Sequence, residues 1–287
     1  MSRTSNGFTL IELLVVLAII ALLVGLILPA LSAARAQVKL TKDGTQIRSI
    51  HQAWLVYAGE ADGAYPVPGL IKRLPIGGSI VPGRGDENIR LNVHQNLYSV
   101  CIMQNYFSPE LCVGPTEPNA RVVVKDDFDW SLYNPLEGVY WDFDFKASLN
   151  IRSNLSYAQV PMDGKRRRVE WRNSGSPDFA VVGNRAVKYG SHAPGEYLAS
   201  QSLLIHGGRR QWVGNVAFND NHIEVLRTMV PDGYTCRKDG VRQPDNFFRN
   251  DTGSGQSVLD GDDIWLSIVI NMLGGCNHDI QWYTSWD

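Results

Sequence analysis

The sequence carries almost no net charge. Its 287 residues include 27 Lys and Arg against 29 Asp and Glu, which gives a formal net charge of -2. Proteins that bind nucleic acid usually carry a basic excess, so we expect no nucleic acid partner and look instead to protein or lipid. With 44% hydrophobic residues, 27 Gly and 14 Pro, the composition is neither disordered nor repetitive. The length suits one large domain or two small ones.

Motifs of catalysis are also missing. The chain has no Gly-x-Ser-x-Gly elbow, no His-Glu-x-x-His, no phosphate-binding loop and no Gly-x-Gly-x-x-Gly. Its six histidines are scattered and form no evident set of metal ligands. We therefore expect a protein that is not an enzyme and has no cofactor.

One long hydrophobic run is present near the start, from Phe8 to Leu28. As a helix it would be about 31 Å long, close to the hydrocarbon thickness of a bilayer, so it predicts one membrane pass. The hydrophobic core of a secretory signal is shorter. A small-x-small site at Ala34-Arg35-Ala36 nevertheless leaves cleavage before Gln37 as an alternative. The flanking charges, Arg3 before the run and Arg35, Lys39 and Lys42 after it, would by the positive-inside rule place the body in the cytoplasm.

Glu12 is the one charged residue inside this run. A carboxylate well inside a spanning helix costs roughly 2.5–3.5 kcal/mol on insertion scales, and such a residue is by default a candidate for function. The alternative is that Glu12 lies close enough to the membrane edge to reach the interface at little cost.

The residues around Glu12 carry a family resemblance. The order Gly7-Phe8-Thr9-Leu10-Ile11-Glu12, followed by a long apolar helix with Pro29 at its far end, resembles the type IV pilin and type II secretion pseudopilin superfamily. The resemblance implies that a prepilin peptidase cleaves between Gly7 and Phe8 and that the new Phe8 amine is methylated. It also implies that the body lies outside the inner membrane, against the charge rule.

Physical chemistry gives these residues plausible tasks. Gly7 lets the backbone enter a protease site closely, because it has no side chain. Cleavage creates a cation on Phe8, and a buried cation needs a partner of opposite sign. Glu12 lies one helical turn further on, on the same face. We therefore expect Glu12 to pair with a Phe8 amine, its own or that of an adjacent subunit, when subunits assemble.

Residues 29–62 predict a continuation of the helix. Pro29, with Gly25, should bend it, and Gly44 is the point at which it could break. The helix should end at Ala61-Asp62-Gly63, where the following Tyr65-Pro66 extends the pseudopilin resemblance. Apolar residues spaced for one helical face predict packing on a sheet: Ile47, Ile50, Trp54, Tyr57 and Ala61.

The remaining head, residues 63–287, reads mainly as β structure, after a loop over 67–85 that is rich in Gly and Pro. Short β-branched or aromatic runs predict strands over 121–125, 139–145, 179–182, 215–219 and 223–227. Asn219 to His222 should form the tight turn of a hairpin. The predicted fold class is α+β, pilin-like, with a long N-terminal helix packed on a mainly antiparallel sheet. The predicted divisions are 1–7 leader, 8–28 membrane and filament-core helix, 29–62 helix continuation and 63–287 head.

A second resemblance lies near this hairpin. His206-Gly207-Gly208, then Asn215-Val216-Ala217-Phe218 and Asp220-Asn221-His222, is similar to the C-terminal signature of a pseudopilin-like subgroup abundant in planctomycetes and their relatives. Here Asn221 stands in place of the usual Gly and the spacer is longer. The residues of this candidate structural motif are His206, Asn215, Asp220 and His222. The alternative is that both histidines are polar turn residues that fix the hairpin.

The head holds four cysteines, Cys101, Cys112, Cys236 and Cys276. An even number outside the cytoplasm suggests disulfides, and four cysteines allow three pairings. We favour the local ones, Cys101 with Cys112 and Cys236 with Cys276. A zinc site would more usually show close cysteine pairs, and there are none.

Two charged clusters complete the candidates. One, in a stretch rich in Gly and Ser, offers oxygen ligands that suit calcium, although a solvated loop explains it as well: Asp251, Asp260, Asp262 and Asp263. The other, residues 165–168, is basic. It reads as a surface turn or, alternatively, as a contact with an acidic neighbouring subunit.

Together these features predict a structural pseudopilin or pilin-like subunit of a type II secretion or type IV pilus-like filament. The expected partners are the prepilin peptidase, other subunits, an inner-membrane assembly platform and, before assembly, membrane lipid. The expected location is the bacterial inner membrane, as a single-pass protein with a periplasmic head, and then a periplasmic or cell-surface filament. The alternative is an exported binding protein or hydrolase that keeps the helix only as a tether.

Overall fold

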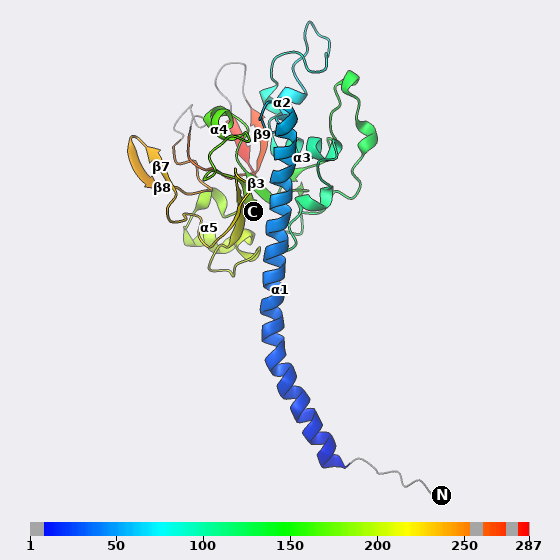
Figure 1. The fold of residues 1–287 in the computed structure, drawn as a ribbon, viewed down its shortest axis with the longest axis vertical. Helices are drawn as coiled ribbons and strands as arrows, with labels where there is room; N and C mark the ends of the chain where they lie inside the picture. Colours follow the sequence, from blue (N-terminus) through cyan, green and yellow to red (C-terminus); the bar gives the residue numbers. More distant parts are fainter. Residues whose placement is uncertain (1–8, 253–260, 274–280, 287) are drawn as a thin grey trace, which may run out of the picture. The chain divides into compact units, whose positions relative to one another are not determined.

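A computed structural model describes residues 9–252, 261–273 and 281–286. The chain divides into two compact units, Met1–Thr41 and Lys42–Asp287. The long helix α1, Leu10–Glu60, contributes to both units (Figure 1). Each unit is described by itself.

In the first unit, α1 is apolar and its side chains are exposed. Its most hydrophobic window has a mean hydropathy of 3.2, so the helix is long and apolar enough to cross a membrane. Exposed Leu, Ile and Val side chains are unfavourable in water, at roughly 25 cal/mol per Å² of apolar surface. This half of α1 therefore needs lipid or other protein around it. Pro29 lies inside the helix, which continues past it.

In the second unit, α1 is the central support of the head. Ile47, Ile50 and Trp54 of the predicted apolar stripe are completely buried, whereas its Tyr57 and Ala61 are half-buried. The Trp54 ring contacts the rings of Tyr98 and Trp171. The helix also runs unbroken through Gly44, so the break considered there is wrong.

The head contains one four-stranded antiparallel sheet in the order β3-β4-β5-β6. Its strands are β3 Tyr157–Gln159, β4 Ala180–Asn184, β5 Gly214–Phe218 and β6 Ile223–Leu226. The predicted hairpin is confirmed, since Ala217 pairs with Ile223 and Asn221 takes the left-handed backbone conformation of the turn, with φ 69°. Gly44 faces Asn215 and Ile223 on this sheet. The predicted α+β class, with a long helix and antiparallel sheets, is therefore correct.

Smaller elements surround this sheet, and Figure 1 shows the β7–β8 hairpin at the edge of the head. Three two-stranded antiparallel sheets pair β1 Ala147–Ser148 with β2 Arg152–Ser153, β7 Thr235–Lys238 with β8 Val241–Pro244, and β9 Val269–Leu273 with β10 Gln281–Thr284. The further α-helices are α2 Pro68–Ile71, α3 His94–Met103, α4 Gly164–Glu170 and α5 Pro194–Ala199. Short 3-10 helices are η1 Ile89–Leu91, η2 Pro109–Cys112, η3 Trp130–Leu132, η4 Pro135–Glu137, η5 Lys188–Gly190 and η6 Gln201–Leu204.

Two predicted strands are wrong. The segments 121–125 and 139–145 each contribute one isolated bridge, Val122 with Ser153 and Val139 with Asn134. Tyr140, Trp141 and Phe145 of the second segment are buried in the core as an irregular stretch, whereas Phe143 is exposed. Asp142 Oδ1 accepts a hydrogen bond from the Asp144 backbone at 2.7 Å and makes a turn there. Burial, not strand pairing, explains why this segment is apolar.

The predicted basic turn at 165–168 is also wrong, because these residues lie in helix α4. Asp163 precedes the helix and caps it by accepting a hydrogen bond from the Gly164 backbone. Within the cluster, Arg166 is buried and forms an ion pair with Asp263. Lys165 pairs with Asp262 at 2.8 Å. At least these two cations are thus used inside the head.

Gly44 gives a test of how closely α1 packs on the sheet. An added methyl group at Gly44 would lie 3.0 Å from Asn215 Oδ1, whereas at Gly59 it would meet nothing within 4 Å. Asn215 is held in place by its hydrogen bond to Asp43. We expect Gly44→Ala to lower the free energy of unfolding by about 1–3 kcal/mol through overpacking. Gly59→Ala, the matched control, should raise it by up to about 1 kcal/mol. Equal stability of the two variants in chemical denaturation would contradict the packing.

Candidate functional site

The start of α1 is a capping box formed by Thr9 and Glu12. The Thr9 backbone N–H donates to Glu12 Oε2 at 2.8 Å, and the Thr9 hydroxyl donates to the same oxygen at 2.7 Å. In return the Glu12 backbone N–H donates to Thr9 Oγ1 at 3.3 Å. Such reciprocal bonds satisfy backbone donors that a helix start otherwise leaves without partners. Glu12 therefore has a structural task at the helix start.

The capping box is visible in the sequence as Thr-x-x-Glu, but it is missed when Glu12 is considered only for its charge. The capping box accounts for a side chain with hydrogen-bonding oxygens at position 12. A Gln would also serve there, so the box alone gives no reason for the negative charge. Gly7 and Phe8 lie outside the described residues, and their cleavage and pairing stay predictions. The structure places Pro29 within α1.

The head has its own polar centre at Asp43 of α1, which is completely buried. His206 Nε2 lies 2.9 Å from Asp43 Oδ2, and Asn215 Nδ2 donates to the same oxygen at 2.8 Å. The Tyr157 hydroxyl donates to Asp43 Oδ1 at 3.1 Å. One carboxylate on the helix thus binds strand β5, strand β3 and the segment after η6.

The protonation of these partners suits their role as donors. Burial, followed by the negative charge of Asp43, raises the pKa of Tyr157 well above its usual value, so its hydroxyl keeps the proton that it donates. His206 Nδ1 lies 3.4 Å from the Thr116 hydroxyl, which can donate to it. That leaves Nε2 as the nitrogen that carries hydrogen toward Asp43. The arrangement gives the buried carboxylate three donors.

A second buried chain of hydrogen bonds joins α1 to the hairpin turn. Asn219 Nδ2 donates to the Glu170 carbonyl at 2.7 Å, which fixes its amide, and Tyr65 donates its hydroxyl hydrogen to Asn219 Oδ1 at 2.8 Å. The Tyr65 oxygen must then accept from His51 Nε2, 3.0 Å away. His51 Nδ1 lies 3.0 Å from Asn221 Oδ1, an oxygen that can only accept a hydrogen bond. The chain thus ties His51 of α1 to both Asn219 and Asn221 of the hairpin.

The candidate motif from the sequence is therefore divided between two places. His206 and Asn215 meet at Asp43, in the interior, and His206 is no surface turn residue. Asp220 and His222 lie at the partly exposed hairpin, where they pair with each other. The His222 ring also stacks on Phe218, with the ring centroids 4.4 Å apart.

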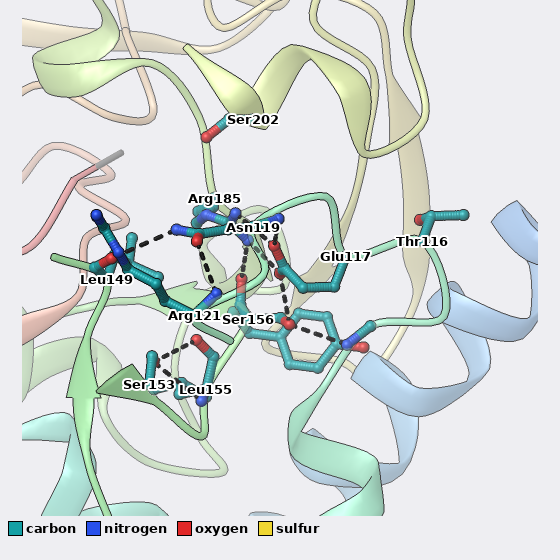
Figure 2. Close-up of polar contacts among 12 residues, drawn as sticks. Thr116, Glu117, Asn119, Arg121, Leu149, Ser153, Leu155, Ser156, Arg185 and Ser202 are labelled. Atoms are coloured by element: carbon teal, nitrogen blue, oxygen red, sulfur yellow. Dashed lines mark hydrogen bonds and ion pairs between the residues drawn. The ribbon is translucent and has the colours of Figure 1, made fainter. Parts of the chain in front are cut away.

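A third network, which the sequence did not suggest, lies close to the first. Arg185 forms a two-pronged ion pair with Glu117, with one bond of 2.5 Å and one of 2.7 Å. Ser156 donates its hydroxyl to Glu117 at 2.8 Å and accepts from the Gly114 backbone. Figure 2 shows Glu117 between Arg185 and Ser156, with Thr116, the His206 partner, on the same segment. The two networks are thus joined through residues 114–117.

These networks support a structural role. Asp43, His206 and Tyr157 resemble parts of an acid–base site, but each is nearly or completely buried. Among the residues that the structure describes, the hydroxyls that reach Asp43 or His206 are those of Tyr157 and Thr116, and both are used as hydrogen-bond partners. The described geometry tethers α1 to the head.

The cysteine and calcium candidates fare differently. Cys101, Cys112 and Cys236 are free, buried thiols, so the expected Cys101–Cys112 bridge is not formed. Burial raises the pKa of the Cys101 and Cys112 thiols, which behave as small apolar core residues.

Cys276 and the calcium candidate Asp260 lie outside the described residues. Of the other calcium candidates, Asp262 and Asp263 have Lys165 and Arg166 as partners, and Asp251 is buried beside Arg249.

Comparison with known proteins agrees with the N-terminal geometry. The family model of the prokaryotic N-terminal methylation motif matches residues 2–28. The chain thus carries the signal of type IV pilins and pseudopilins at its start. No curated protein and no solved structure matches the chain. The match does not reach the head, and the planctomycete subgroup therefore stays a prediction.

Asp43 can be tested by removing its charge. Asp43→Asn would turn an amide NH2 toward hydrogen-bond donors, because all three partners donate to this side chain. Breaking a buried, hydrogen-bonded ionic centre should lower the free energy of unfolding by about 3 kcal/mol. Asp62→Asn is the matched control, since Asp62 is exposed and its left-handed backbone, φ 49°, suits Asn. Denaturant unfolding of the chain in detergent measures both. Wild-type stability of Asp43→Asn would refute the anchoring role.

His51 gives a pH dependence. Burial lowers its pKa to about 4, so the folded chain keeps it neutral while the unfolded chain protonates it below about 6.5. The unfolded state then binds more protons, and stability falls as the pH drops from 6.5 to 4, by about 3 kcal/mol for this residue. His94, whose pKa burial lowers to about 3, acts in the same direction.

Stability measured against pH in His51→Gln should show a smaller loss over this window than in wild type. His192→Gln, at an exposed histidine, should leave the slope unchanged. An unchanged slope in His51→Gln would contradict the neutral, buried state of His51.

Proposed function

We propose that this protein is a structural subunit of a filament of the type II secretion or type IV pilus kind. The observation that carries the proposal is the methylation motif over residues 2–28, placed at the start of a helix able to cross a membrane. The helix residues 10–28 are exposed, since no other described residue of the first unit covers them. Packing against the same helix of other subunits would cover this surface after the chain leaves lipid.

Maturation would proceed by cleavage between Gly7 and Phe8 by a prepilin peptidase, with methylation of the new Phe8 amine. The capping box fixes where the helix starts, at Leu10, and in the sequence Phe8 is the residue just before the capping Thr9. The Glu12 carboxylate is already held at this end of the helix by Thr9. Assembly would add a second requirement at position 12, a negative charge. The Phe8 cation of an adjacent subunit would come next to the Glu12 carboxylate where water is excluded.

The head would be carried by the second half of α1. Asp43, His206, Asn215 and Tyr157 bind that helix to the sheet, so the head would follow the helix as subunits add to the filament. The expected partners are other subunits, an inner-membrane assembly platform and the peptidase. The expected place is the inner membrane, with the head in the periplasm, and then the filament.

A second candidate function is a binding protein or hydrolase tethered by the helix. It rests on the size of the head, which makes up most of the chain. The described polar networks are buried and do not themselves favour this alternative. Under the tether hypothesis the charge at position 12 would not matter for activity of the head.

The separation of charge from capping gives the test. Glu12→Gln keeps the acceptor for the Thr9 N–H but loses the charge, whereas Glu12→Val loses both. We expect both variants to be cleaved after Gly7 and both to be incorporated into filaments at least tenfold less than wild type, because an unpaired buried cation costs several kcal/mol. Immunoblots of sheared filaments, compared with whole membranes, measure incorporation.

The control is Thr9→Ser, which keeps both parts of the capping box. It should be incorporated like wild type. If Glu12→Gln is incorporated normally while Glu12→Val is not, Glu12 serves only as a helix cap and the ion-pair mechanism is wrong. If none of the chains, wild type included, enters a filament, the tether hypothesis takes its place.

A further inference from the structure

Three potential ligands converge at the base of the β7–β8 hairpin. Cys236 lies on β7, Asp245 directly follows β8, and Asp251 lies one turn later. All three are buried, with 6%, 3% and 4% of their surfaces exposed. The sulfur and one oxygen from each carboxylate lie within 4.8 Å of one another. The Asp245 backbone donates to the Tyr234 carbonyl, so the hairpin itself holds Asp245 beside Cys236.

Asp245 is the unusual member of this group. Its Oδ2 accepts a hydrogen bond from the Ile264 backbone at 3.0 Å. Its Oδ1 is buried and, among the described residues, accepts no hydrogen bond. An unsatisfied buried oxygen costs roughly 1–3 kcal/mol, and more if it is charged. This oxygen is therefore left for a further partner.

The nearby arginines are committed to the other carboxylates. Arg249 Nε donates to Asp251 Oδ1 at 2.6 Å, and Arg166 forms its ion pair with Asp263. Within the described part of the chain, Asp251 Oδ2 accepts a hydrogen bond from the Asn246 backbone, at 3.2 Å, and it keeps room for another ligand. The Cys236 sulfur has a weak contact with Gln243 at 3.7 Å. A cation placed among the three groups would meet two carboxylate oxygens and a thiolate.

We propose that Cys236, Asp245 and Asp251 bind one zinc-type divalent transition-metal ion. Sulfur selects against calcium and magnesium, which take oxygen ligands, and suits zinc, which also accepts carboxylates. With ordinary zinc bond lengths the ligand atoms would be about 3.5 Å apart. The ligand atoms already lie within 4.8 Å of one another, so binding needs only a small local contraction, and a water molecule completes the tetrahedron.

This ion would have a structural task. It ties β7 to the segment 245–251, where hydrogen bonds already link Asn246 to Gly190 and Asp251 to Asp263. It also neutralises Asp245, which among the described residues has no ion-pair partner of its own. The sequence gives little sign of the site, because it has no close cysteine pair and its ligands meet only through the hairpin. The site differs from the expected calcium set and shares only Asp251 with it.

Metal binding can be measured on the full chain purified in detergent under reducing conditions. Metal is first removed with a chelator, and the chain is then dialysed against Zn²⁺ and analysed for bound metal. We expect one equivalent of zinc and a higher unfolding temperature. Co²⁺, used in place of Zn²⁺, should give the absorption of a cobalt–thiolate bond. Absence of stoichiometric zinc or of that absorption in the wild-type chain overturns the proposal without any variant.

Variants then assign the ligands. Cys236→Ser and Asp245→Asn should each weaken zinc binding at least tenfold and remove the rise in unfolding temperature. The matched control, Asp239→Asn, changes the same charge at the exposed tip of the same hairpin and should bind like wild type. Equal affinity in all four chains overturns the proposal. So does a peptide mass map of the protein as isolated, without reductant, that joins Cys236 to Cys276.

Discussion

The buried carboxylate of Asp43 is the interaction on which the head depends. It lies on a helix, has no exposure, and is satisfied only when Tyr157, Asn215 and His206 all point to it. A buried charge is tolerated only with such partners, and removal of the carboxylate would leave its three donors without their acceptor. The Asp43 side chain therefore fixes which residues of the sheet lie against α1. Gly44, next to it, supplies the close approach that these bonds need.

The same helix meets an opposite constraint in its first half. There the side chains are apolar and exposed, and nothing in the first unit covers them. Glu12 satisfies backbone donors at the start of this apolar helix. Its side chain accepts from the Thr9 N–H, and its own N–H donates to Thr9 Oγ1. The negative charge goes beyond what the cap needs. The proposal that it meets a Phe8 amine gives that charge a reason, and the methylation motif supports it.

The sequence predicted the features that follow from local periodicity and local motifs. The apolar stripe at Ile47, Ile50 and Trp54, the hairpin at Asn221 and the long apolar N-terminal helix are of this kind. Features set by distant contacts were missed. No pattern in residues 139–145 distinguishes a strand from an irregular segment. No pattern near Arg166 shows that this residue will be buried in an ion pair with Asp263. His206 reads as a turn residue until the fold brings it to Asp43.

Above all, we propose that this chain is processed as a prepilin. The most direct measurement is the intact mass and N-terminal sequence of the protein isolated from membranes of a cell that contains a prepilin peptidase. We expect a chain that starts at Phe8 and carries one methyl group on its amine. A chain that starts at Met1, or at Gln37 after a signal-peptidase cut, would contradict it.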